Sequence, residues 1–214
     1  MRGDTRDAMK NSATQKGMRL LAVIAAVIAA MCVVLVIAYG GGAEAAHAVV
    51  RWTARTSLVL FTLAYVSRPL VQLRPHSTAR DILAYRKWIG LGFATSHGFH
   101  LAGIVAIAWP DPGAFIGAQD PTIVIAVATF LLLGAMAITS VERVRKAMQP
   151  KRWKRLHRTG MHVAWIVFFT TYAAAIRASA LYIAPAAVLL VIAAVRAAAW
   201  FRGKRHQRAM SHAA

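Results

Sequence analysis

The chain has 214 residues, 58% of them hydrophobic, and several uninterrupted apolar runs approach or exceed the roughly 20 residues that cross a bilayer. A soluble domain of this length would not need so many long apolar runs. The formal net charge of +19 argues for membrane loops and against a nucleic-acid binder, because Lys and Arg lie between the apolar runs and not along one helical face. The composition predicts an all-α, polytopic membrane protein.

Six transmembrane helices in one bundle are predicted. A basic leader occupies residues 1–17, and the apolar run after it is longer than the roughly 7–15 residues of a cleaved signal peptide. One domain is therefore expected over residues 18–201, followed by a basic tail at 202–214. In chain order the spans lie at about 18–39, 54–73, 86–109, 121–140, 159–177 and 182–200.

The distribution of basic residues predicts the orientation. With the N-terminus in the cytoplasm, Arg51, Arg55 and Arg177 fall on the far side and all the others of the 26 Lys and Arg residues on the near side. The positive-inside rule therefore favours an N-in/C-in topology, with anionic lipid at the cytoplasmic face as a partner. The basic inner loop 141–158 either contacts this lipid surface or docks an acidic redox partner, a flavin phosphate or haem propionates.

Two smaller features receive structural interpretations. The three glycines at 40–42 follow no strand and precede no Lys-Ser/Thr pair, so they predict a turn and not a phosphate-binding loop. Cys32 is the one cysteine and lies inside the first apolar run, where a small packing residue is expected.

Histidine is the main chemically active residue of the apolar runs, which are poor in carboxylates. His97 and His100 lie in the third predicted span, and their i, i+3 spacing places them on one helical face. His157 and His162 lie at the start of the fifth span. Imidazole is an axial ligand of haem iron, and helical bundles build such sites between facing helices. Each of the four could instead be a hydrogen-bonded core or interfacial residue.

Small residues surround the histidines of the third span and would let a flat macrocycle or another helix approach closely. They are Gly90, Gly92, Ala94, Ser96, Gly98, Ala102 and Gly103. Four further histidines fall in predicted loops or tails and are expected at the surface. They are His47, His76, His206 and His212.

Three segments carry a family resemblance by their order and spacing. They are TARTSLVLFTLAYVSRPL (53–70), AYRKWIGLGFATSHGFH (84–100) and TSVERVRKAMQPKRWKRLHR (139–158). Together they resemble the ferric-reductase-like transmembrane domain family, over roughly residues 50–175. The closest likeness within it is to the haem-binding membrane subunit of the bacterial periplasmic methionine sulfoxide reductase system. The resemblance implies a b-type haem and a location in the bacterial inner membrane.

The resemblance also implies which residues hold the haem iron. It places axial ligands at His100 and at His157, and a further family histidine at the position that Thr170 occupies here. Three outcomes are open. His162 pairs with His97 or His100 in a shifted site, the iron is five-coordinate on His100, or the chain keeps the fold without the cofactor.

By the same resemblance, the expected function is electron transfer across the membrane. Electrons would pass from a cytoplasmic-side donor, a flavin or a quinol, to a periplasmic redox partner protein. The chain has no dinucleotide-binding fingerprint, so it is expected to be a redox subunit served by a separate reductase or quinol, and not a complete enzyme. The alternative is a haem-less membrane scaffold or assembly partner that retains the fold. A transporter is disfavoured by the shortage of carboxylates in the spans.

Overall fold

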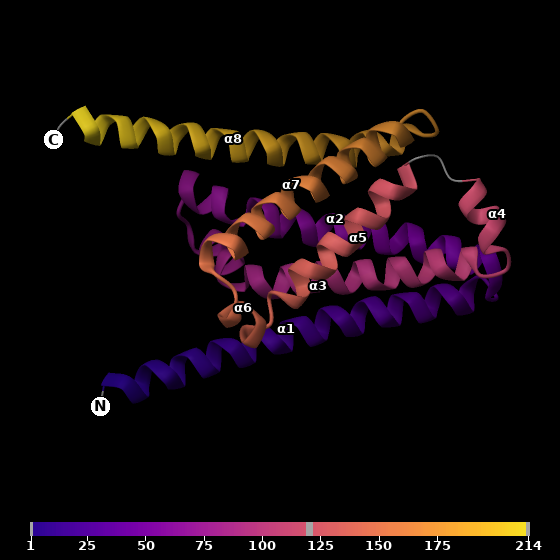
Figure 1. The fold of residues 1–214 in the computed structure, drawn as a ribbon, viewed down its shortest axis with the longest axis horizontal. Helices are drawn as coiled ribbons and strands as arrows, with labels where there is room; N and C mark the ends of the chain where they lie inside the picture. The colour runs from indigo at the N-terminus through magenta and orange to yellow at the C-terminus, as the bar shows by residue number, and fades with distance from the viewer. Residues whose placement is uncertain (1, 119–121, 213–214) are drawn as a thin grey trace. The chain divides into compact units, whose positions relative to one another are not determined.

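The computed structural model describes residues 2–118 and 122–212, without the side chains of 2–10, 122, 206, 209 and 212. Within these ranges the chain is helical and has no strand, which confirms the all-α class (Figure 1). The elements are α1 (Arg2–Ala38), α2 (Gly42–Leu73), α3 (Ser77–Ala108), α4 (Pro112–Gly117), α5 (Thr122–Ile138), α6 (Glu142–Ala147), α7 (Pro150–Ala175), the 3-10 turn η1 (Ala180–Tyr182) and α8 (Ile183–His212).

Four helical segments in the described part of the chain are long and apolar enough to cross a membrane. They are Asn11–Ala38, Gly42–Leu73, Ser77–Ala108 and Ala180–Arg205. They match the first, second, third and sixth predicted spans, of which the first and third extend one residue further, and they make this a multi-pass membrane protein. The apolar part of α5 is shorter, and α7 starts with a basic stretch. Membrane crossing by these two helices, and the N-in/C-in orientation, therefore stay predictions.

Apolar side chains cover much of the outer surface of the long helices. A water-soluble protein rarely exposes so much contiguous apolar surface, whereas lipid tails solvate it readily. Strongly exposed examples are Val27, Ile37, Val59, Leu131 and Leu190.

Glycine, proline and a capping aspartate set the helix ends. The predicted turn between α1 and α2 is confirmed, because Gly40, Gly41 and Gly42 have φ values of 67°, 78° and 69°. Residues with a side chain rarely adopt this left-handed conformation. Pro150 occupies the first turn of α7, where its missing N–H costs no helical hydrogen bond. Asp111 caps α4 by accepting a hydrogen bond from the Ala114 N–H at 2.8 Å.

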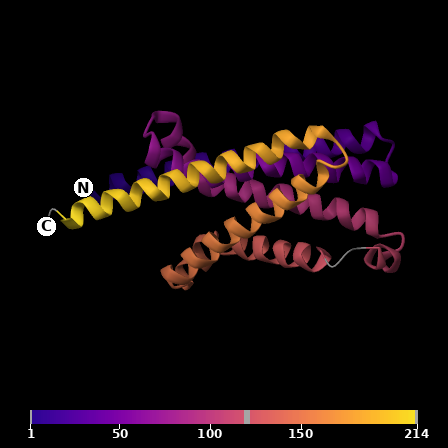
Figure 2. The ribbon, with the colours of Figure 1, turned by 90° about the horizontal axis from the view of Figure 1, so that it is seen from above.

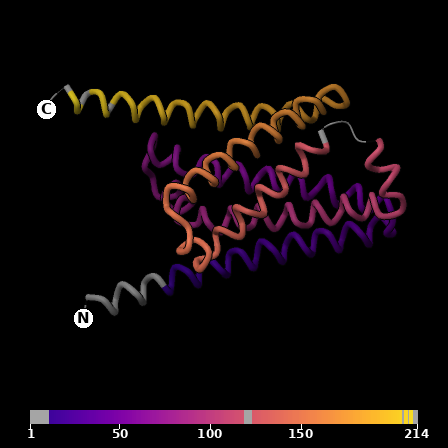
Figure 3. Tube along the Cα trace, in the orientation of Figure 1, coloured from indigo at the N-terminus to yellow at the C-terminus, as the bar shows by residue number. Residues whose placement is uncertain are grey.

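The helices divide into two compact units. The first unit is Met1–Leu60 with Lys87–Ile125, and the second is Phe61–Arg86 with Ala126–Ala214. Helices α2 and α3 each contribute to both. In the second unit, α7 and α8 are neighbouring helices joined through η1, as Figures 2 and 3 show. The Trp165 indole N–H in α7 donates to the Leu189 carbonyl of α8 at 2.9 Å, which fixes this pair.

Close helix packing in the first unit depends on two glycines of α3. A Cβ at Gly92 would lie 2.9 Å from Ile24 of α1, and one at Gly103 would lie 2.8 Å from Val50 of α2. Part of the predicted small-residue face therefore serves helix contacts. A Cβ at Gly98, next to His97, would meet no atom within 4 Å among the described residues.

In the second unit, Gly160 of α7 lies where this helix packs against α5, and its substitution gives the first testable prediction. Gly160 is buried, and a Cβ there would overlap the Sδ of Met136. Gly160→Leu is expected to cost about 1–3 kcal/mol of stability, because overpacking forces side chains off their rotamers or moves the backbone. The measurement is the unfolding midpoint in SDS mixed micelles.

Gly203→Leu on α8 is the matched control, since a Cβ at that exposed site meets no atom within 4 Å in the described chain. Equal midpoints for the two variants would show that α5 and α7 do not pack at Gly160.

Candidate functional site

A polar seam runs between α2 and α3 inside the first unit. It consists of His97, His100 and Ser96 of α3 with Thr53 and Ser57 of α2. The three hydroxyl side chains have 0% exposure, so they are fully buried. The two imidazoles lie on one face of α3, as their spacing predicts, with ring centroids 5.6 Å apart. Buried hydroxyls and imidazoles need hydrogen-bond partners, and the seam supplies them.

His100 is held by main-chain and side-chain oxygens of α2. Its Nδ1 lies 3.0 Å from the Val50 carbonyl oxygen and 3.2 Å from Thr53 Oγ1. A carbonyl oxygen only accepts, so Nδ1 carries the proton and the lone pair is on Nε2. The Thr53 hydroxyl donates to the Val49 carbonyl at 2.6 Å, which leaves its oxygen free to accept from the same Nδ1–H.

His97 is held by a chain of hydroxyl groups. Its Nδ1 lies 2.9 Å from Ser57 Oγ. The Ser57 hydroxyl donates to Ser96 Oγ at 2.9 Å, and the Ser96 hydroxyl donates to the Thr53 carbonyl at 3.0 Å. The ring of Phe93 packs edge-on against the imidazole, with centroids 4.8 Å apart.

The donor set of the seam fits haem iron at His100. A metal-binding imidazole typically donates its second ring N–H to a carbonyl or carboxylate, which fixes the tautomer and aims the other nitrogen at the metal. His100 has this arrangement with Val50. The described residues contain no group of three or more His, Cys, Asp or Glu that could hold a bare metal ion. Haem iron needs only one or two protein ligands, because the macrocycle supplies the rest.

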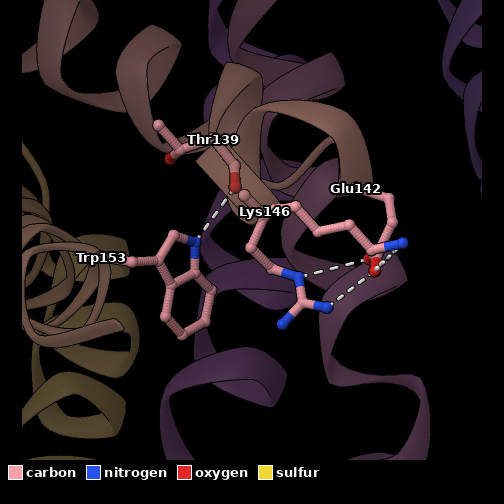
Figure 4. Close-up of polar contacts among 5 residues, drawn as sticks. Thr139, Glu142, Lys146 and Trp153 are labelled. Carbon is pink, nitrogen blue, oxygen red and sulfur yellow. Dashed lines mark hydrogen bonds and ion pairs between the residues drawn. The ribbon is translucent and has the colours of Figure 1, made fainter. Parts of the chain in front are cut away.

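His157 lies on α7 in the second unit, beside the end of α5. Its Nε2 is 3.2 Å from Thr139 Oγ1, and the Thr139 hydroxyl makes a shorter bond, 2.7 Å, to the Ala135 carbonyl. Nε2 is therefore the donor and the lone pair lies on Nδ1. The Trp153 indole packs against the imidazole with the rings tilted by 33° and their centroids 4.3 Å apart. Its N–H donates to the Thr139 carbonyl at 3.0 Å (Figure 4). Ligation of iron through Nε2 would require His157 to leave Thr139.

His162 lies five residues further along α7 and faces α2 within the same unit. Its Nδ1 is 3.4 Å from the hydroxyl of the buried Tyr65, and the two rings meet at 88° with centroids 6.1 Å apart. The side chain of His162 itself is largely exposed. The structure thus places His97 and His100 on one helix face, and gives His157 a partner just after α5 and His162 a partner on α2.

Two arginines satisfy the α2 backbone beside Tyr65. Pro69 lies inside α2 and has no N–H, so the Tyr65 carbonyl four residues earlier has no helical donor. Arg196 of α8 reaches this oxygen at 3.4 Å, with its guanidinium 4.6 Å over the Tyr65 ring. Arg86 donates to the adjacent Ala64 carbonyl at 2.9 Å. A partly buried charge in a span is costly, and these carbonyls and the ring partly offset that cost.

Thr170, which the resemblance aligns with a further family histidine, is exposed. Its hydroxyl donates to the carbonyls of Ile166 and Val167, at 2.9 and 3.1 Å, within its own helix. Tyr172, two residues later, is the buried side chain of this turn. Thr170 therefore makes none of the contacts expected of a buried ligand position.

The basic segment between α5 and α7 holds one acidic residue, Glu142. Its carboxylate accepts from Arg145 at 2.8 and 3.2 Å and lies 3.8 Å from Lys146 (Figure 4). The hydrogen bond and negative charge of Glu142 raise the pKa of Arg145. The ion pairs are half-exposed or more, so they add little stability.

Two of the four remaining histidines are described, and both are exposed as predicted. His47 lies within α2 and not in a loop, because the Ala-rich segment after the glycine turn continues the helix. His76 precedes α3 and its Nδ1 accepts from the Ala79 N–H at 3.3 Å. The side chains of His206 and His212 lie outside the described residues.

Thr53, Ser57 and Arg196 were not predicted as site residues. A signal was available for each. Thr53 and Ser57 are four residues apart within a largely apolar stretch and so share one helix face. Arg196 is a charge inside the sixth predicted span, and Pro69, inside the second, is the residue that creates an acceptor for it.

Comparison with known proteins places the chain among membrane redox components. Residues 51–171 match the family described as ferric reductase like transmembrane component. The magnetosome protein MamZ of Magnetospirillum gryphiswaldense is 33% identical over 103 residues, which are 46% of this chain and 16% of MamZ. This chain thus matches a small part of that longer relative. No solved structure matches it. The finer likeness to the methionine sulfoxide reductase subunit stays an expectation.

Proposed function

This chain belongs to the ferric reductase like transmembrane component family, and we propose that it is a b-type haem-binding electron-transfer subunit of the bacterial inner membrane. The observation that carries the proposal is His100, whose Nδ1–H is bonded to the Val50 carbonyl so that Nε2 holds the lone pair. A bound haem would supply the one-electron carrier, which amino-acid side chains do not provide.

His100 would hold the iron from the α3 side of the site. The α2 backbone fixes the orientation of this imidazole before any ligand binds, which lowers the entropic cost of ligation. His97, His157 and His162 are the other histidines that the sequence nominates for ligation, and His97 shares the α3 face of His100. Like His100, His97 makes its hydrogen bond through Nδ1, here to Ser57. His157 instead makes its hydrogen bond to Thr139 through Nε2. Apolar helix surfaces around such a site would exclude water and tune the potential.

The electron path is proposed from the charge distribution. The basic loop 141–158 would dock a cytoplasmic-side reductase that carries a flavin, or lie beside a quinol at an anionic lipid surface. Electrons would leave to a periplasmic redox partner protein. The chain would then be a redox subunit of a larger oxidoreductase system, and the first outcome to establish is whether it holds haem.

A haem-less scaffold or assembly partner is the second candidate. The exposure of Thr170 at the family ligand position and the contact of His157 with Thr139 favour it. Such a protein would keep the helical fold and use its surfaces for assembly alone.

A reduced-minus-oxidised visible spectrum with pyridine haemochrome quantification separates the two candidates. The full chain is produced with ample haem and purified in detergent, beside a mock purification from cells that lack the gene. We expect a b-type spectrum with stoichiometric haem. A colourless, folded protein would overturn the electron-transfer proposal and favour the scaffold.

A further inference from the structure

We infer that Ser57 and Ser96 are positioning residues that select the tautomer of His97 and thereby present its Nε2 as a second coordinating nitrogen beside His100. The coordinating role rests on the proposed haem function, whereas the tautomer selection is independent of it. The directions of the hydrogen bonds in the polar seam determine this tautomer. Each hydroxyl has a single proton, so one fixed end determines the direction of the whole chain.

The fixed end is the Thr53 carbonyl in the backbone of α2. A carbonyl has no proton, so the Ser96 hydroxyl must donate across their 3.0 Å contact. Ser96 has then used its proton, and its oxygen accepts from Ser57 at 2.9 Å. Ser57 in turn has no proton left for the imidazole. At 2.9 Å, therefore, His97 Nδ1 must be the donor, which leaves the lone pair on Nε2.

Burial makes this direction hard to reverse. Thr53, Ser57 and Ser96 all have 0% exposure, so water does not offer these hydroxyls alternative partners. If these hydrogen bonds ran in the opposite direction, no proton would lie between the Ser96 hydroxyl and the Thr53 carbonyl. The carbonyl would then be an unsatisfied buried acceptor, which is costly. The α2–α3 packing therefore dictates the tautomer of His97 through the two serines.

The result is that both histidines of α3 have the same tautomer by different means. The Val50 carbonyl determines the tautomer of His100 directly, and two serines determine that of His97. The two imidazoles share one helix face with centroids 5.6 Å apart. Two nitrogens so close on one helix cannot take the opposite faces of one macrocycle, so His97 would serve a second ligand or a second group beside the first.

Solid-state ¹⁵N NMR of histidine-labelled full chain in lipid vesicles, prepared without haem, tests the inference. The His97 signals are assigned by their loss in His97→Gln. In the wild type we expect a protonated Nδ1 and an unprotonated Nε2. In Ser96→Ala, Ser57 loses its acceptor and is free to donate to Nδ1. The ratio of the Nδ1–H to the Nε2–H tautomer is then expected to fall by about tenfold, the equivalent of one neutral hydrogen bond.

Ser96→Thr keeps the hydroxyl and should restore the wild-type ratio. Thr95→Ala is the matched control, because the Thr95 hydroxyl bonds the Leu91 carbonyl of its own helix and, among the described residues, makes no other hydrogen bond. His100 signals should stay unchanged in every variant and report that the seam is folded. If Ser96→Ala does not fold, Ser57→Ala removes the acceptor itself and should leave His97 with both tautomers populated.

A wild-type His97 with a protonated Nε2 would overturn the inference, as would a folded Ser96→Ala protein with an unchanged ratio. Neither result depends on haem. A colourless protein with the expected tautomers would therefore refute the proposed function and still support the tautomer selection by Ser57 and Ser96.

Discussion

Replacing His100 with alanine is expected to lower haem affinity by at least about 100-fold, so that the purified protein loses its Soret band. Partners that merely orient a metal-binding histidine are worth roughly 10–100-fold in affinity, and the ligand itself is worth more. His100 is bonded through Nδ1 directly to a backbone carbonyl, the Val50 oxygen at 3.0 Å, which fixes its orientation. Its loss should therefore reduce haem content more than the loss of His97, His157 or His162.

The measurement is haem per protein by pyridine haemochrome, on equal amounts of folded protein. His47→Ala is the matched control, because His47 is exposed on α2 and lies outside the seam. Full haem retention by His100→Ala, with loss in another histidine variant, would move the site to that residue and refute the assignment of His100.

The second large effect is expected at Arg196, which bonds the carbonyl that Pro69 leaves without a helical donor. Arg196→Leu should cost about 1–3 kcal/mol, because it leaves the carbonyl of the buried Tyr65 without a donor. The control is Arg202→Leu, which removes a 2.9 Å bond to the Leu73 carbonyl at the exposed end of α2. That carbonyl remains accessible to water or headgroups, so a smaller loss is expected there. The readout is the unfolding midpoint in mixed micelles.

A double-mutant cycle with Pro69→Ala identifies the cause. The alanine would restore a backbone N–H that bonds the Tyr65 carbonyl, so the oxygen would no longer need Arg196. The cost of Arg196→Leu should fall by about 1 kcal/mol or more in the Pro69→Ala background. Additive costs would show that Arg196 stabilises the protein through its 4.6 Å contact with the Tyr65 ring and not through the carbonyl.

Several features of this protein could be read from the sequence because they are local. The length of an apolar run decides whether a helix can span the bilayer, and the runs in α1, α2, α3 and α8 meet that requirement. The turn at Gly40 to Gly42 follows from the backbone freedom of glycine. The shared face of His97 and His100 follows from helical periodicity alone. The all-α membrane class was determined at this level.

Other features were decided only by the tertiary structure, because their physical causes lie far apart in the chain. The tautomers of His97 and His100 depend on oxygens of α2 some 40 to 50 residues earlier, since a histidine's proton position is set by its partner. Pro69 finds its compensating donor in Arg196, on the last helix. No local pattern specifies which hydroxyl, carbonyl or guanidinium arrives at such a group. Packing brings these groups together, and burial makes each contact obligatory, because an unsatisfied polar group away from water is costly.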